Sequence, residues 1–307
     1  MLDATLAGPW NGYLPGPRLA GRTPAEWVEA PPTRFTLTPV APLIGAVIEG
    51  VDLAEPVDAE LFAQLNQALL EWKVLFFRDQ DVTGAEQAAF AAHWGPLETH
   101  PFYGQITGTE ADAPEVVRLE KDAQVGGFEN AWHSDVSWRV EPSLGSVLRA
   151  VELPEIGGDT LWSDMAAAYE RLTPQLQERI DGLVAVHDWW DNFGLAMEPG
   201  ERERLRPDFP AVEHPVVRTH PETGRKTLYV NRIFTQRIAG LEPDESAELL
   251  DHLCQQATFP EYQCRWRWQP GDVALWDNRA TQHYAVSDYW PNRRVMERIT
   301  ICGDRPR

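Results

Sequence analysis

The sequence predicts one mainly β domain with flanking helices, arranged as an antiparallel β-sandwich. One reason is that the second half of the chain consists largely of short runs rich in β-branched and aromatic residues, such as 146–151 and 212–219, separated by turns. Another is that residues 261–268 alternate strictly between apolar and polar side chains, which is the period of a half-buried strand. Helical patterns in this half are limited to about 163–181 and 243–257.

The first half contributes two predicted helices and a strand. Apolar residues recur at helical spacing over 58–72, and the apolar run 74–77 that follows is typical of a buried strand. Thr83 and Glu86 form a capping box, which indicates that a second helix begins there and continues to about Trp94.

The N-terminal part of the chain differs in composition from the rest. Residues 1–34 are rich in Pro and Gly, which favours an extended arm over a folded domain. The folded domain is therefore expected to span residues 35–307, a length that can bury a substantial core.

The composition excludes several classes of partner. Lys and Arg total 27 against 47 Asp and Glu, a formal net charge of -20, so the surface should repel nucleic acid and anionic membrane surfaces. The sequence contains no apolar run of about 18 residues, the length that could span a bilayer. The N-terminus lacks a secretory signal pattern, and Cys254, Cys264 and Cys302 lack the paired spacing of a disulfide framework, so we expect a cytoplasmic protein.

Two histidines and one aspartate are candidate metal ligands. His133 and Asp135 stand two residues apart, so on an extended segment their side chains point to the same face. His283 follows a polar loop after a predicted strand, where a third ligand could be presented. Such a triad leaves three positions of an octahedral Fe(II) open. The alternatives are a hydrogen-bonded or surface histidine without a metal, or a zinc ion in a hydrolase.

Two arginines are candidate anion-binding residues. In the predicted strand 293–301, Arg294 and Arg298 share one face with Met296 and Thr300. If that face is the interior, both guanidiniums need anions to offset the cost of burial, and arginine suits bidentate capture of a carboxylate or sulfonate. The alternatives are that the opposite face is buried, or that internal Asp and Glu residues pair with both arginines.

These residues lie in motifs that resemble those of the taurine dioxygenase family of Fe(II)- and 2-oxoglutarate-dependent oxygenases. The resemblance extends from about Phe35 to the C-terminus, and its motifs are Trp132-His133-Ser134-Asp135, the blocks 157–162, 214–221 and 265–270, and the most specific block, 276–284, followed by Arg294 and Arg298. The resemblance implies a double-stranded β-helix, also called a jelly roll or cupin-like fold. It also implies Fe(II) held by His133, Asp135 and His283, with 2-oxoglutarate and O2 as co-substrates.

The resemblance further implies roles for the residues around the metal. Those for 2-oxoglutarate are Arg294, which binds the distal carboxylate, Thr160 and Trp276. Those for the substrate are Arg298, which grips its anionic group, His100, Tyr103, Glu129, Phe234 and Phe193. Glu129 replaces an asparagine that the family carries four residues before the first ligand. A carboxylate there would oppose a nearby sulfonate but could pair with a substrate ammonium.

Together these features predict a dioxygenase that hydroxylates an unactivated C–H bond of a small anionic substrate and releases succinate and CO2. The expected substrate is a sulfonate such as taurine, or a related sulfate or carboxylate. One alternative is the same chemistry on an amino-acid-like or aromatic metabolite. Further alternatives are a zinc hydrolase, which would leave Arg294 and Thr160 without a purpose, and a non-catalytic binding protein. The chain is expected to form a homo-oligomer, a dimer or a tetramer.

Overall fold

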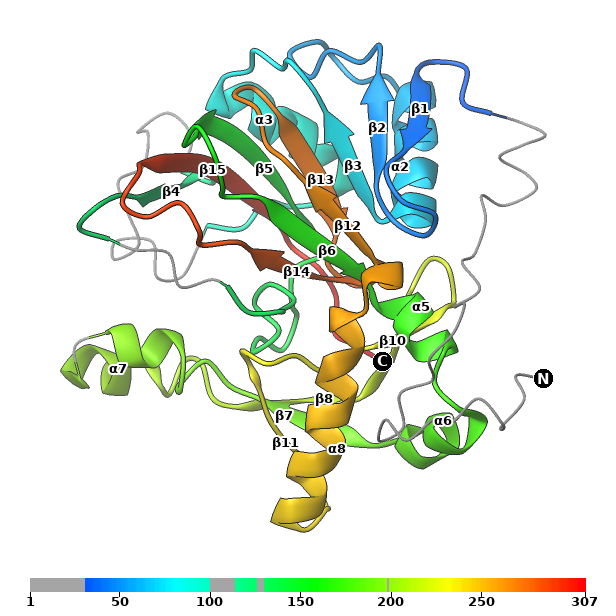
Figure 1. The fold of residues 1–307 in the computed structure, drawn as a ribbon, viewed down its shortest axis with the longest axis vertical. Coiled ribbons are helices and arrows are strands. Elements are labelled where there is room, and N and C mark those ends of the chain that lie inside the picture. Colours follow the sequence, from blue (N-terminus) through cyan, green and yellow to red (C-terminus); the bar gives the residue numbers. More distant parts are fainter. Residues whose placement is uncertain (1–30, 100–113, 126–129, 198) are drawn as a thin grey trace.

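The main sheet of the protein has seven strands. The structure, a computed structural model, describes residues 31–99, 114–125, 130–197 and 199–307 (Figure 1). The strands run in the order β1 (Thr36–Pro39), β2 (Ala46–Glu49), β3 (Val74–Phe77), β13 (Val273–Asp277), β5 (Gly145–Glu152), β15 (Arg294–Ile301) and β4 (Val117–Lys121). Neighbours in this sheet are antiparallel, apart from the parallel pair β2 and β3.

A second, three-stranded sheet packs against one face of the main sheet. Its order is β12 (Gln263–Trp266), β6 (Thr160–Asp164) and β14 (Thr281–Ala285), all antiparallel. Aromatic side chains fill the space between the sheets: Phe76 stacks on Trp266 with ring centroids 4.0 Å apart, and Trp162 lies 5.8 Å from Trp276. The predicted mainly β sandwich of jelly-roll type is thereby confirmed.

Helices cover the other face of the main sheet. Helix α2 (Ala59–Trp72) begins at the N-cap Asp58 and buries its apolar stripe beside β1 to β3 (Figure 1). Helix α3 (Gly84–Ala91), continued by the 3-10 turn η2 (Ala92–Trp94), begins with the predicted capping box of Thr83 and Glu86. Both predicted helices of the first half are therefore present.

The remaining elements form the lower part of the molecule in Figure 1. They are α5 (Met165–Glu170), α6 (Pro174–Ile180), η3 (Phe193–Ala196), α7 (Pro199–Leu205), the sheet of β11 (Thr235–Ile238), β7 (Val184–His187) and β8 (Val212–Pro215), the hairpin of β9 (Val217–Thr219) and β10 (Lys226–Leu228), α8 (Pro243–Gln255), η4 (Gln256–Thr258) and η5 (Pro260–Tyr262). Helix α8 contacts β11 and confirms the helix predicted at 243–257.

Two predicted elements were wrong. The helix expected at 163–181 is two short helices, because Asp164 caps α5 and the pair Thr173-Pro174 starts α6 afresh. The strand expected at 212–219 is divided at Val216 between β8 and β9, which pair with different strands. In both places the apolar pattern continues past the point where one element ends and the next begins. Periodicity alone therefore does not reveal that boundary.

The predicted faces of the strands are largely confirmed. Strand β12 is shorter than the predicted 261–268, but the expected inward residues are all buried: Tyr262, Cys264, Trp266 and Trp268. Strand β15 differs from a simple alternation because residues on both of its faces are buried.

No helix in the described ranges is long and apolar enough to cross a membrane.

Candidate metal centre

The three predicted ligands meet at one point of the structure. His133, Asp135 and His283 are all buried, and one potential ligand atom from each lies within 4.8 Å of the others. Nε2 of His133 and Nε2 of His283 each lie 3.7 Å from Oδ1 of Asp135. The two imidazole rings have centroids 4.1 Å apart. The residues that were predicted to converge are therefore brought together from segments far apart in the sequence.

Main-chain pairing holds the two histidines side by side. The N–H of His133 donates to the carbonyl of His283 at 3.1 Å, and the reverse bond measures 2.8 Å. The hydroxyl of Ser134 adds a further contact between the same two segments by donating to the carbonyl of Thr281 at 2.8 Å. We call this row of hydrogen bonds between the segments of His133 and His283 the seam. The segment carrying His133 thus runs as a short extension along the edge of β14.

Both imidazoles suit metal binding in the neutral form. Nδ1 of His133 donates to the carbonyl of Ala131 at 2.8 Å, which leaves the Nε2 lone pair free on the side of Asp135. Burial, reinforced by His133, lowers the pKa of His283 to about 3, although Asp135 acts in the opposite direction. Neutral imidazole is the form that ligates metal ions.

The carboxylate is held in the ionised form. Burial by itself would raise the pKa of Asp135, but the Arg298 guanidinium, together with the hydrogen bond from Ser146, acts in the opposite direction, and the pKa lies below its usual range. Nη1 of Arg298 donates to Oδ1 at 3.1 Å, and the Ser146 hydroxyl donates to Oδ2 at 3.2 Å. Asp135 therefore supplies a full negative charge inside a low-dielectric interior.

These donors fit Fe(II). Each imidazole Nε2 lies 3.7 Å from the carboxylate oxygen, a separation that two bonds of about 2.1 Å to one ion can span. The set of two imidazoles and one carboxylate is typical of non-haem Fe(II) oxygenases, where it leaves one face of the ion for co-substrate and oxygen.

The residues predicted for 2-oxoglutarate are all buried. Arg294 is buried and packs beside Gly158, where a Cβ would come within 3.1 Å of the arginine side chain. Thr160, two residues further on, is buried and accepts a hydrogen bond from Nε1 of Trp268 at 3.0 Å. Trp276 is buried with its ring centroid 5.1 Å from that of His283. Their role in binding 2-oxoglutarate stays a prediction.

The predicted substrate residues are placed only in part. Arg298 points toward the triad, and its side chain is 16% exposed. Phe234 is buried, with its ring centroid 6.3 Å from that of His133. His100, Tyr103 and Glu129 lie outside the described residues, as does the side chain of Phe193.

An acidic residue and an arginine near the triad are not among the predicted site residues. Glu98 is buried and forms an ion pair with Arg139. Burial raises the pKa of Glu98, while Arg139 and Arg298 act in the opposite direction. The sequence offers no local signal for this pair, because Glu98 and Arg139 are 41 positions apart.

A pair of buried histidines, His187 and His214, predicts how stability depends on pH. Burial lowers the pKa of His214 to about 4 and that of His187 well below its usual value, and the two rings lie 5.2 Å apart. Since the unfolded chain takes up these protons near pH 6.5, stability should be complete above that pH and fall as the pH decreases toward about 4. Urea unfolding between these limits should show a smaller pH slope for His214→Asn than for the wild type. The exposed His93→Asn is the control, and an unchanged slope for His214→Asn would contradict the assignment.

Comparisons with known proteins agree with this geometry. The family model described as "Taurine catabolism dioxygenase TauD, TfdA family" matches residues 36–300. An alkylsulfatase from Acinetobacter baylyi is 40% identical over 286 residues, covering 91% of this chain and 88% of the relative. An alpha-ketoglutarate-dependent sulfate ester dioxygenase from Pseudomonas putida is 40% identical over 276 residues, covering 87% of this chain and 89% of the relative. The crystal structure of a taurine dioxygenase from Burkholderia xenovorans matches with a TM-score of 0.76 and 37% sequence identity. The match covers 89% of this chain and 92% of that chain.

Proposed function

Because the chain belongs to the taurine catabolism dioxygenase TauD, TfdA family, we propose that it oxidises an alkyl sulfate ester at the carbon that bears the ester oxygen. The protein is an Fe(II)- and 2-oxoglutarate-dependent dioxygenase. Bound Fe(II) supplies the activation of O2, which places one oxygen atom in succinate, with loss of CO2, and the other on the substrate carbon. The hydroxylated ester then breaks its C–O bond to sulfate and gives an aldehyde and inorganic sulfate.

The residues of the chain would divide this work between metal, co-substrate and substrate. His133 and His283 would bind Fe(II) through Nε2, and the ionised Asp135 through its carboxylate. Arg294, buried beside Gly158, would hold the distal carboxylate of 2-oxoglutarate.

The position of Arg298 is the observation that carries the substrate proposal. Its guanidinium touches Asp135 at 3.1 Å, so an anionic group bound by Arg298 lies next to the metal. Nε of Arg298 is buried and has no hydrogen-bond partner within the described ranges, which leaves a donor for that group. An alkyl sulfate joins one such anion to an apolar chain, which suits the neighbouring ring of Phe234.

A substrate panel tests the proposal. Purified protein with Fe(II), 2-oxoglutarate and O2 should release succinate and an aldehyde with a medium-chain alkyl sulfate, and kcat/KM should exceed that for taurine by about tenfold or more. The panel should also contain an aryloxyalkanoate and an amino acid, which represent the carboxylate and amino-acid-like alternatives. Faster turnover of taurine or of either carboxylate would overturn the choice of a sulfate ester.

Replacing Arg298 with alanine gives the mutational arm of this test. Loss of a charge-assisted hydrogen bond of about 1.5–3 kcal/mol should raise KM for the alkyl sulfate about 10- to 150-fold. The affinity for 2-oxoglutarate should change much less. Arg293→Ala is the matched control, because Arg293 lies on the surface and pairs with Glu120 and Glu152. Equal losses of 2-oxoglutarate and alkyl sulfate binding would contradict the division of roles.

We further propose that the enzyme works in the cytoplasm as a homo-oligomer, a dimer or a tetramer. The reducing compartment is supported by Cys254, Cys264 and Cys302, which are all free thiols. Light scattering coupled to size-exclusion chromatography tests the oligomeric state, and a monomer peak would exclude it.

A further inference from the structure

The turn between β13 and β14 carries a buried asparagine that is bonded to the backbone of a proposed metal ligand. Oδ1 of Asn278 accepts a hydrogen bond from the N–H of Asp135 at 2.9 Å. Nδ2 of the same side chain donates to the carbonyl of Asp135 at 2.9 Å. One amide therefore binds both polar groups of the Asp135 main chain, as a neighbouring strand would do.

This contact completes a seam along the metal-binding segment. His133 pairs with His283 through two backbone bonds, Ser134 binds the carbonyl of Thr281, and Asp135 is held by Asn278. Three successive residues are thus each fixed to the segment that carries the third ligand. After Asp135 the chain turns away, since Val136 has a positive φ of 46°. At Asp135, just before this turn, the side chain of Asn278 makes the two hydrogen bonds that a paired strand would make.

A second set of contacts fixes the orientation of the Asn278 side chain. Its Nδ2 also lies 3.0 Å from Oγ of Ser143, and its backbone N–H donates to the carbonyl of Leu144 at 2.8 Å. Both of those residues directly precede β5, whose Ser146 donates to the Asp135 carboxylate. Asn278 is therefore fixed through its Nδ2 and through its backbone N–H, in addition to its bonds with Asp135.

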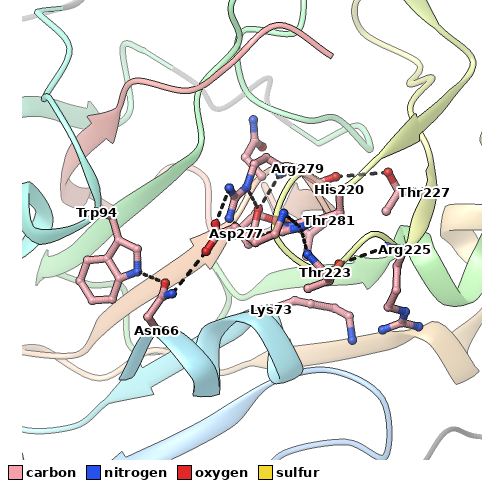
Figure 2. Close-up of polar contacts among 12 residues, drawn as sticks. Asn66, Lys73, Trp94, His220, Thr223, Arg225, Thr227, Asp277, Arg279 and Thr281 are labelled. Carbon is pink, nitrogen blue, oxygen red and sulfur yellow. Dashed lines mark hydrogen bonds and ion pairs between the residues drawn. The ribbon is translucent and has the colours of Figure 1, made fainter. Parts of the chain in front are cut away.

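The residues on either side of Asn278 hold the turn in place through buried contacts. The Asp277 carboxylate, 1% exposed, accepts bonds from Nε2 of His220 at 2.9 Å and from Nη2 of Arg279 at 2.7 Å (Figure 2). Thr281 donates through Oγ1 to the carbonyl of Asp277 at 2.8 Å. This buried network of charged and hydrogen-bonded groups restricts the motion of the turn that carries Asn278.

We propose that Asn278 is a positioning residue that fixes the main chain of Asp135 and thereby aims its carboxylate at the metal bound by His133 and His283. This role rests on the proposed function, since it requires a metal at the triad. Removing the amide leaves the three donor side chains in the sequence but frees the Asp135 backbone. Losses of about 10- to 100-fold in metal affinity are usual when the partners that orient ligands are removed.

Titration with Co(II), followed by its visible absorption bands, tests the proposal without turnover. Asn278→Ala should bind Co(II) about tenfold more weakly than the wild type or worse. Gln80→Ala is the matched control: the Gln80 amide likewise accepts from a backbone N–H, that of Leu53, and donates to backbone carbonyls, those of Val51 and Arg78. This control should lose stability in urea while keeping wild-type Co(II) affinity.

The possible outcomes separate the two proposals. Wild-type affinity for Co(II) in folded Asn278→Ala would overturn the positioning role alone. Failure of the wild type itself to bind Co(II) or Fe(II) would instead overturn the metal site and the proposed function with it. If Asn278→Ala does not fold, Asn278→Ser replaces it, since a hydroxyl keeps the turn polar but is too short to reach both groups of Asp135. The same tenfold loss is expected of that variant.

Discussion

Replacing His283 with alanine is expected to abolish the Fe(II) complex with 2-oxoglutarate. The residue is one of the three proposed protein donors among the described residues, and its Nε2 lies 3.7 Å from the Asp135 carboxylate. A site with one imidazole and one carboxylate would keep too few donors to hold Fe(II) against water. Anaerobic addition of Fe(II) and 2-oxoglutarate should give the wild type a weak visible charge-transfer band, and the variant should show none.

The control for this experiment is another histidine replaced in the same way. His252→Ala, on α8, should keep the band because His252 belongs to no metal cluster among the described residues. His133→Ala should behave like the His283 variant. A band of undiminished intensity in either triad variant would remove that residue from the ligand set.

Replacing Asp277 with alanine is expected to cause the largest loss of stability. Its carboxylate is fully enclosed and meets His220 and Arg279, while Arg279 also pairs with Glu222 at 2.7 Å. Burial would raise the pKa of Asp277, but Arg279 and His220 hold it below its usual range, so the group is charged. Removing one partner of a buried pair leaves the Arg279 charge without its main compensation, which costs about 3–5 kcal/mol.

Urea unfolding measures this loss, with a surface aspartate for comparison. Asp181 pairs with Lys226 at 3.2 Å on the surface, so Asp181→Ala should cost no more than about 1 kcal/mol. The unfolding midpoint of Asp277→Ala should therefore lie far below that of Asp181→Ala. Similar midpoints for the two variants would mean that the buried network contributes no more than a surface pair.

The metal triad could be predicted from sequence because much of its signal is local. His133 and Asp135 need only an extended backbone to share a face, and the alternation of a single strand places Arg294 and Arg298 on a common face. That this face points inward was implied by the family resemblance and not by the alternation. The contact of Asn278 with Asp135 spans 143 positions and joins a side chain to a backbone. No pattern in one sequence encodes such a contact, so only the folded chain reveals it.

The errors in the fold have a related cause. The helical pattern over 163–181 is real on each side of Thr173, yet the capping hydroxyl and Pro174 restart the helix in a new direction. Likewise, the run 212–219 keeps its β character while exchanging one partner strand for another at Val216. Local propensity predicts the type of structure here, whereas tertiary partners decide where an element ends.

The main-chain seam between His133 and His283 also has a consequence for the choice of metal. Since backbone pairing sets the spacing of the donors, the frame stays the same whichever divalent ion of similar radius arrives. First-row ions above iron in the affinity series would then compete for it, and the supply of ions in the cell would decide which one occupies it.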